Sequence, residues 1–462
     1  MSRPNPESNK EQLSILKKVT PDFNSMIRIT FWNGLGFIFF MFIKSYVVIY
    51  FFGGSGVQLG IIMALQPFAR LISMPFIAYL TDYTSKKKLV LIGSMGRTIS
   101  YFLYWLSLVI RNLYMFGMGT FLQGLLVAFF WPPFFSLISE KSSKEHRIQA
   151  LATGRGKMIG YGFLIGAIIS IPIFALVRIF IPDNISLMYS PLLIFSLINL
   201  IAGYRFYVKV DENLTYEKYS NSMNEGILHT NNEDLIAINE KLEPKEEINK
   251  KPRKIFYIGF IALIMVILAT SVTLTIYSPF ISAYLIETLL SDYNAIIVPI
   301  IVMIVYFPAQ VISQLVAPLL GRLFDRLYTP LSIVIIGLFK ALMIWLMIST
   351  LTSIGFAIIL IFLYIATESN GYLIQAIMSR ISIKHRGKIF GLNMWIDRLG
   401  RVIGPLIGGI LWDTLTYNTP FIISIYMGLC LIPIFIFAVR SLSSDMVEQV
   451  DIDTMGILNV KK

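Results

Sequence analysis

The chain has 462 residues, of which 56% are hydrophobic and only 14% are charged, whereas a soluble globular protein carries about a quarter of its residues as charges. This composition excludes an ordinary soluble enzyme or binding domain, because water cannot host so much uninterrupted apolar surface. The formal net charge of +12 does not indicate nucleic-acid binding, since the basic residues gather in short loops between apolar blocks. The sequence therefore predicts a polytopic membrane protein that lies in a lipid bilayer and binds no nucleic acid.

Apolar blocks long enough to cross a bilayer, which takes roughly 20 helical residues, recur along the whole chain. They are too long and continuous for β-barrel strands. Backbone polar groups in lipid must be paired within each segment, so each block is predicted to be an α-helix. The expected fold class is therefore an all-α integral membrane protein. Its twelve expected spans are 26–51, 57–81, 88–110, 112–138, 150–177, 186–208, 254–286, 295–320, 330–351, 354–380, 388–413 and 419–440.

One long hydrophilic segment divides these spans into two sets of six. It is rich in Asn, Glu and Lys and has no sustained apolar stripe, so a mostly disordered linker is expected. The expected organisation is a cytoplasmic N-terminal tail (1–25), an N-terminal six-helix bundle (26–208), a cytoplasmic linker (209–253), a C-terminal six-helix bundle (254–441) and a cytoplasmic C-terminal tail (442–462).

The basic loop residues are distributed unequally between the two sides. Loops on one side hold Lys86, Lys87, Lys88, Lys141, Lys144, Arg147, Arg322, Arg326, Arg380, Lys384, Arg386 and Lys388, whereas the opposite loops hold only Arg111 and Arg178. Basic loops stay in the cytoplasm, so both termini are expected there, in a protein of the plasma membrane. A secondary role of these residues in binding anionic lipid stays open. The one cysteine, Cys430, excludes an intrachain disulfide.

Two short motifs occur once in each half. The stretch "PFIAYLTD" (75–82) matches "PLLGRLFD" (318–325), and "EHRIQA" (145–150) matches "KHRGKI" (384–389). The first pair ends the second span of a half, and the second pair lies between its fourth and fifth spans. The two offsets, 243 and 239 residues, nearly agree, which indicates that the halves are copies of one six-helix unit. Such duplication is typical of secondary transporters, whose substrate site lies between the repeats near the bilayer midplane.

With these residues the chain resembles the major facilitator superfamily. The superfamily's signature loop, Gly-x-x-x-Asp-Arg-x-Gly-Arg-Arg, follows its second span. Here "AYLTDYTSKKK" retains Asp82 and the basic Lys86 and Lys87, and "GRLFDRLYTP" retains Gly321 and Asp325. The resemblance covers residues 26–440. It implies two pseudo-symmetric six-helix bundles, no enzymatic activity, no cofactor and no metal.

The repeated aspartates are candidates for a cytoplasmic gate formed by Asp82, Arg147, Asp325 and Arg386. A carboxylate at this depth can pair with an arginine and also cap the N-terminus of a neighbouring helix. We expect Asp82 near Arg147 and the start of the eleventh span, and Asp325 near Arg386 and the start of the fifth. The alternative is that these are ordinary loop residues with one capping Asp in each half.

In the superfamily, the first, fourth, seventh and tenth spans of the chain line the substrate cavity. The resemblance therefore implies the cavity residues Asn33, Lys44, Gln123, Trp131, Tyr277, Ser278, Glu368 and Gln375. The sequence "FWPPF" (130–134) is expected to kink the fourth span. Packing within a bundle is the alternative role for each of these side chains.

Charges inside the spans are costly and usually mark a pathway. All three histidines lie in loops, so Glu368 and Asp397 are the candidates for proton coupling. A static salt bridge is the alternative for Glu368, and an i, i+4 pair with Arg401 is the alternative for Asp397. The charges within the N-terminal spans are all basic, which favours an anionic or zwitterionic substrate; they are Lys44, Arg70, Arg97, Arg155 and Lys157.

These features predict a secondary active transporter that moves a small organic solute by alternating access, coupled to protons and acting as a monomer. A facilitative uniporter is an open alternative, as is a non-transporting receptor or sensor with the same fold. No phosphate-binding Gly-x-x-x-x-Gly-Lys loop is present in the hydrophilic segments, so an ATP-driven pump is excluded.

Overall fold

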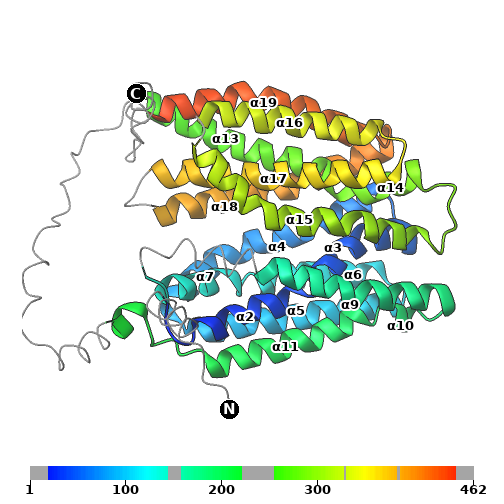
Figure 1. Ribbon diagram of the computed structural model, residues 1–462, viewed down its shortest axis with the longest axis horizontal. Helices are drawn as coiled ribbons and strands as arrows, with labels where there is room; N and C mark the ends of the chain where they lie inside the picture. Colours follow the sequence, from blue (N-terminus) through cyan, green and yellow to red (C-terminus); the bar gives the residue numbers. More distant parts are fainter. Residues whose placement is uncertain (1–18, 144–157, 221–253, 327–328, 382–385, 444–462) are drawn as a thin grey trace, which may run out of the picture.

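The computed structural model describes residues 19–143, 158–220, 254–326, 329–381 and 386–443, and these are almost entirely helical. Within them the one β pairing is an isolated bridge between Val19 and Ser142. The helices form two bundles that lie side by side, each built from six consecutive spans (Figure 1). The prediction of an all-α protein with twelve spans in two halves is confirmed.

The N-terminal half contains four continuous spans and two interrupted ones. The first span is divided into three parts and the fourth into two. In chain order the elements are α2 (Phe23–Gly34), α3 (Phe37–Tyr46), η1 (Val47–Phe51), α4 (Gly56–Tyr83), α5 (Lys86–Val109), α6 (Leu113–Val127), α7 (Trp131–Glu140), α9 (Met158–Phe180), the short α10 (Ile185–Met188) and α11 (Pro191–Lys209).

The C-terminal half has one interrupted span, its first. The elements are α13 (Lys254–Tyr277), η4 (Ser278–Phe280), α14 (Ile281–Leu289), α15 (Val298–Arg326), α16 (Thr329–Ser349), α17 (Ser353–Ile381), α18 (Arg386–Thr414) and α19 (Thr419–Ser443). Within the described residues, 11 spans are long and apolar enough to cross a membrane by length and composition alone. The remaining span, α18, carries Asp397, Arg398 and Arg401, which lower its hydropathy.

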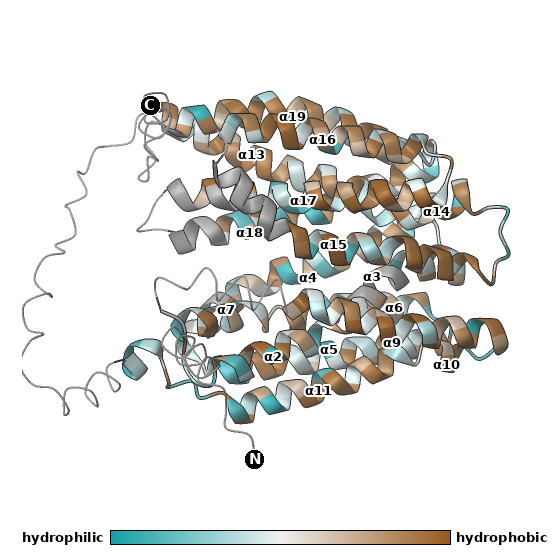
Figure 2. Ribbon diagram, viewed as in Figure 1, coloured by the Kyte–Doolittle hydropathy of each residue, from teal (hydrophilic) through white to brown (hydrophobic). Residues whose placement is uncertain are grey.

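The outer surface of both halves is apolar. Hydrophobic residues extend along most of the length of the helices (Figure 2). Large apolar side chains such as Phe76 (66% exposed) and Leu197 (60% exposed) face outward. A soluble monomer rarely exposes such continuous apolar surface, so this surface is the one that contacts lipid.

Local sequence explains the interruptions of the helices. Span four breaks between Val127 and Trp131, because Pro132 and Pro133 cannot donate the hydrogen bonds of a helix interior but fit its first turn. In the first span of each half an irregular turn occurs at the same depth. Val47 of the π-helical η1 and Ser278 of the 3₁₀-helical η4 each lie 24 residues after the start of their span.

Glycines bring matching pairs of helices into close contact within each half. A Cβ atom on Gly162 of α9 would lie 2.5 Å from the Phe31 carbonyl oxygen of α2. In the other half, a Cβ atom on Gly404 of α18 would collide with Thr275 of α13. Spans one and five thus pack as spans seven and eleven do, through small residues that allow close approach. The "GRVIGPLIGG" stretch (400–409) is therefore a packing surface.

The two halves meet through two related pairs of helices. Helix α4 packs along α18, and α9 packs along α15. Because α4 and α15 are the second spans of their halves, and α9 and α18 the fifth spans, the two contacts are equivalent under a pseudo-twofold axis.

The end of the bundles at which α11 ends and α13 begins is called the linker end here, and the opposite end the far end. At the linker end the chain packs onto the N-terminal half slightly beyond the expected boundaries. The Lys141 amine donates to the Asp22 carboxylate (2.7 Å) and to the carbonyl oxygens of Asp211 and Leu214. The first span consequently starts at Phe23, and the beginning of the expected linker is docked against the bundle. Residues 221–253 lie outside the described residues.

Candidate functional site

The far end carries hydrogen bonds that join the two halves. The Asp413 carboxylate near the end of α18 accepts bonds from the backbone N–H groups of Gly56 and Val57, each at 2.8 Å. These groups begin α4 in the other half. Ser55 and Gln58 complete a capping box at the same helix start. An anion at a helix N-terminus is stabilised by the unpaired N–H groups and the helix dipole.

Two further contacts cross between the halves at the far end. The Tyr50 hydroxyl of η1 donates to Glu287 Oε1 (3.0 Å) and to the Ala283 carbonyl oxygen (3.1 Å) of α14. Arg178 Nη2 of α9 donates to the Ala295 carbonyl oxygen, just before α15, at 3.2 Å. The Arg178 contact joins spans five and eight, and the Asp413 contact joins spans eleven and two. The two contacts are therefore pseudo-symmetric counterparts.

A fully buried guanidinium lies within the N-terminal half. Arg97 of α5 has no exposed surface and donates to Asn33 Oδ1 at 2.7 Å. Its charge lies 4.5 Å from the Phe37 ring centroid and 5.5 Å from that of Phe130. Its Nε and Nη2 atoms have no hydrogen-bond partner among the described residues. Aromatic faces stabilise a cation but do not cancel its charge.

A second arginine lies where the halves meet. The side chain of Arg70 on α4 makes no hydrogen bond or ion pair with the described residues, and its Nε atom is buried. The guanidinium groups that act on it belong to Arg398 and Arg401 of α18 and to Arg97 of α5. Lys44 of α3 is also a charged neighbour of Arg70.

One carboxylate faces this group of cations. Asp397 accepts hydrogen bonds from Arg401 Nε (2.9 Å) and Ser271 Oγ (2.6 Å), and its Oδ2 lies 3.8 Å from Arg398 Nη1. The expected i, i+4 contact with Arg401 is confirmed. Asp397 is thus held by groups of its own half. Among the described contacts, the guanidiniums of Arg398 and Arg401, which act on Arg70, thus lie near one carboxylate, that of Asp397.

Lys44 is 5% exposed and donates to Gln66 Oε1 of α4 at 2.7 Å. Its amine also lies 4.1 Å from the Phe40 ring centroid. Among the described residues no carboxylate pairs with Lys44.

The C-terminal half contributes a polar surface of uncharged groups around Glu368. Tyr364 lies one turn before Glu368 on α17 and is close to both Glu368 and Gln310. Tyr277 of α13 and Tyr306 of α15 lie near Tyr364. Three tyrosine hydroxyls from three helices therefore gather in the membrane interior, and that of Tyr364 lies near the Glu368 carboxyl group.

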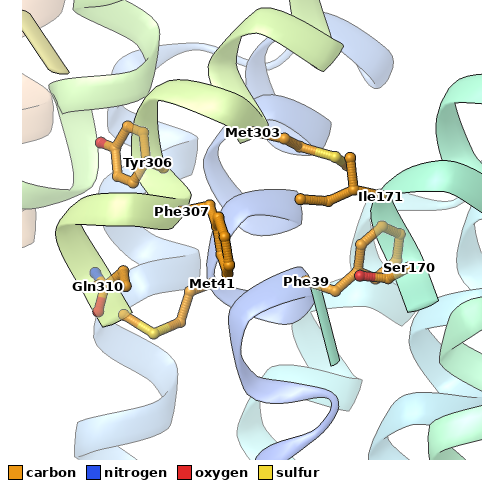
Figure 3. A pocket seen from close by; sticks show the side chains of 8 residues that line it. All are labelled: Phe39, Met41, Ser170, Ile171, Met303, Tyr306, Phe307 and Gln310. Carbon is orange, nitrogen blue, oxygen red and sulfur yellow. The ribbon is translucent and has the colours of Figure 1, made fainter. Parts of the chain in front are cut away.

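A cavity of about 340 Å³, counting the space at its open side, lies between the halves. Figure 3 shows its side chains: Phe39 and Met41 of α3, Ser170 and Ile171 of α9, and Met303, Tyr306, Phe307 and Gln310 of α15. Ser170 Oγ and Gln310 Nε2 are buried and have no hydrogen-bond partner among the described residues. The centre of a water-sized sphere fits in only about 20 Å³ of this space, so in this conformation the cavity has room for about one water molecule.

The structure distributes the expected cavity residues between several environments. Asn33 and Gln123 are fully buried within the N-terminal half, where Gln123 accepts a bond from Tyr104 at 3.0 Å. Trp131 stacks on Phe135 at 5.5 Å between centroids. Tyr277 is 1% exposed, and Ser278 begins η4.

Several expected residues lie outside the described part of the chain. Arg147 belongs to this group, and for Asp82, Asp325, Arg386 and Gln375 the structure describes the helical backbone only. The cytoplasmic gate therefore stays a prediction. Sequence reasoning identified Arg70 and Arg97 as intramembrane charges but did not single out Tyr50, Glu287 or Asp413.

Comparison with known proteins identifies the family. The model of the Major Facilitator Superfamily matches residues 26–382. The chain belongs to this superfamily. A relative, Multidrug resistance protein 2 of Bacillus subtilis (strain 168), is 24% identical over 379 residues, which are 80% of this chain and 83% of the relative.

Solved superfamily structures share the fold. The nucleoside transporter NupG superposes with a TM-score of 0.63 at 12% identity, over 90% of this chain and 99% of NupG. A bacterial homologue of the human lysosomal transporter Spinster, in an inward-facing and occupied conformation, gives 0.63 at 13% identity over 93% of this chain and 99% of that protein. These identities establish the fold alone. As a superfamily member, the chain is a multi-pass membrane transport protein.

Proposed function

We propose that this chain is a secondary active transporter that moves a small organic solute across the plasma membrane by alternating access, coupled to protons. The observation that carries the proposal is the far-end closure. Asp413 with Gly56, and Arg178 with Ala295, join pseudo-symmetric pairs of helices at the far end of an interface that also contains a cavity and intramembrane charges. Rocking about a central site requires such a separable contact at each end.

The conformation has the far end closed. With the linker end placed in the cytoplasm, as the basic loops favour, a closed far end is the closure expected of an inward-facing state, the state named for the Spinster homologue. Each far-end hydrogen bond contributes about 0.5–1.5 kcal/mol net, so a small set can be broken and remade in every cycle. The opposite state then uses the cytoplasmic gate of Asp82, Arg147, Asp325 and Arg386.

Proton coupling is assigned to Glu368 and Asp397. Protonation of Asp397 would weaken its pair with Arg401 and free that guanidinium, while Glu368 would exchange its proton beside the Tyr364 hydroxyl. Both carboxyl groups lie in spans of the C-terminal half, so their protonation can change how that half meets the other. The protein acts as a monomer in this proposal.

The test uses purified protein in liposomes that contain a pH-sensitive dye. Sugars, nucleosides, amino acids, carboxylates and cationic drugs are first screened by thermal shift, and solutes that stabilise the protein are then supplied across a pH gradient. Solute-dependent proton movement is expected, with loss of coupling in Glu368→Gln or Asp397→Asn but not in the exposed control Asp292→Asn. Flux that ignores the pH gradient would select the uniporter, and binding without flux would select a receptor.

A further inference from the structure

The geometry points to an organic anion, bearing a carboxylate or a phosphate, as the solute, with Arg70 as the group that binds its charge. This inference rests on the proposed transport function and names the substrate class for it. It depends on four features of the interface between α4 and α18.

The first feature is that Arg70 has no counterion among the described residues. The groups that act on it are the guanidiniums of Arg398, Arg97 and Arg401 and the uncharged Tyr104 hydroxyl. Its buried Nε has no hydrogen-bond partner in the described part of the chain. An arginine stays protonated in a protein, and a charge in the membrane interior normally has a partner or faces a water-filled pathway.

The second feature is that the nearby carboxylate is already engaged. Asp397 is bound by Arg401 and Ser271 of its own half. It is therefore already paired, and within the described part of the chain no carboxylate is among the groups that act on Arg70.

The third feature is that the neighbouring cationic side chains are held in place by contacts within the N-terminal half. Arg97 is fully buried and held by Asn33 and two aromatic rings. Lys44, also a neighbour of Arg70, is held by Gln66. These groups keep the site positive, and electrostatic interactions are stronger inside a protein than in bulk water.

The fourth feature is that the cations belong to both halves. Arg70 is on α4, and the guanidiniums of Arg398 and Arg401 that act on it are on α18. An anion bound by Arg70 at this interface is therefore attracted to groups of both halves, and guanidinium groups bind carboxylate and phosphate in a bidentate geometry. Anion binding would thus favour the approach of the halves that alternating access requires.

The test measures thermal stability with matched probes at constant ionic strength. The pairs are benzoate with benzamide and adenosine monophosphate with adenosine, and inorganic phosphate serves as the smallest anion. At least one anionic probe is expected to raise Tm by about 2 °C or more, and its neutral counterpart to leave Tm unchanged. The shift should vanish in Arg70→Gln, persist in reduced form in Arg70→Lys, and be unchanged in Arg205→Gln, whose side chain is exposed on α11.

A second measurement needs no ligand. If Arg70 is an uncompensated charge, Arg70→Gln should raise the Tm of the empty protein, whereas loss of a structural arginine would lower it. The inference is overturned if Arg70→Gln is less stable than wild type, if no anionic probe shifts Tm, or if neutral probes act equally.

Flux measurements separate this inference from the proposed function. Uptake of a neutral or cationic solute by wild type and Arg70→Gln alike would reject the anionic substrate and leave transport intact. Anion-dependent stabilisation without flux of any probe would keep the binding site and reject transport.

Discussion

Asp413 and Gly56 lie 357 positions apart in the chain, and the Asp413 carboxylate accepts the first backbone N–H of helix α4 at 2.8 Å. One half of the molecule thereby caps a helix of the other half. The same device was expected at the linker end, with Asp82 near the start of span eleven. The structure uses it at the far end, where span eleven supplies the carboxylate and span two supplies the helix start.

Asp413→Asn should weaken the far-end closure. The variant loses the negative charge at the helix start and one of two acceptor oxygens, which is worth about 1 kcal/mol. We therefore expect the ratio of closed to open far end to fall about fivefold. Spin labels at Tyr114 and Leu351, which are 88% and 90% exposed, report the separation of the halves at this end when Cys430 is replaced by Ser.

The control is Asp292→Asn, an exposed carboxylate near the far end whose contact is with the adjacent Ser291. It should leave the distance distribution unchanged. An Asp413→Asn protein with the distances of wild type would show that this cap does not hold the halves together.

Tyr50→Phe tests the second far-end contact. The variant keeps the ring and removes the hydroxyl that donates to Glu287 and Ala283. Loss of this bond should cost about 0.5–1.5 kcal/mol and shift the same label pair toward longer distances. Tyr293→Phe, an exposed tyrosine (55%) in the loop before α15, is the matched control, and equal behaviour of the two variants would assign no gating role to Tyr50.

Gly60→Ala should obstruct the approach of α4 to α18. A Cβ atom on Gly60 would collide with the Pro405 carbonyl oxygen and lie 3.5 Å from Gly409 Cα. Overpacking of this kind costs typically 1–3 kcal/mol, so the far end should open and transport should slow. The control is Gly428→Ala, in which the nearest atom to the new Cβ lies at 4.0 Å, and it should behave as wild type. A Gly60→Ala protein with the far-end distances and transport rate of wild type would refute the tight-contact explanation.

The sequence was sufficient to predict the helices because their signals are local. A bilayer sets the length of each apolar block, and a Pro-Pro pair cannot continue a helix, so span four was expected to bend near Trp131 and does break there. The contact between Asp397 and Arg401 was likewise predictable, since i and i+4 side chains are neighbours on a helix. In the structure Arg401 Nε lies 2.9 Å from Asp397 Oδ2.

The partners of buried polar residues were not predictable in the same way. A span number places Asn33 and Gln123 near the cavity but does not tell which helix face meets the other half. Both instead satisfy polar groups of their own bundle, Asn33 with Arg97 and Gln123 with Tyr104. The far-end contacts of Asp413 and Tyr50 join distant segments and have no local pattern, so they became visible only once the halves were placed together.

Lys141→Met should destabilise the N-terminal half without affecting the far end. The Lys141 side chain is 1% exposed and pairs with Asp22, which ties the start of the first span to the end of the fourth. Its removal leaves a mostly buried carboxylate without its cation, and breaking such a pair costs about 3–5 kcal/mol. The apparent Tm of the purified protein should fall by several degrees, while Lys209→Met, which changes an exposed lysine at the end of α11, should not lower it. The double variant Asp22→Asn with Lys141→Met should recover part of the lost stability, because the unpaired carboxylate charge is then removed. A double variant as unstable as Lys141→Met alone would mean that this region is held by the bonds from Lys141 to the Asp211 and Leu214 carbonyl oxygens and not by the ion pair.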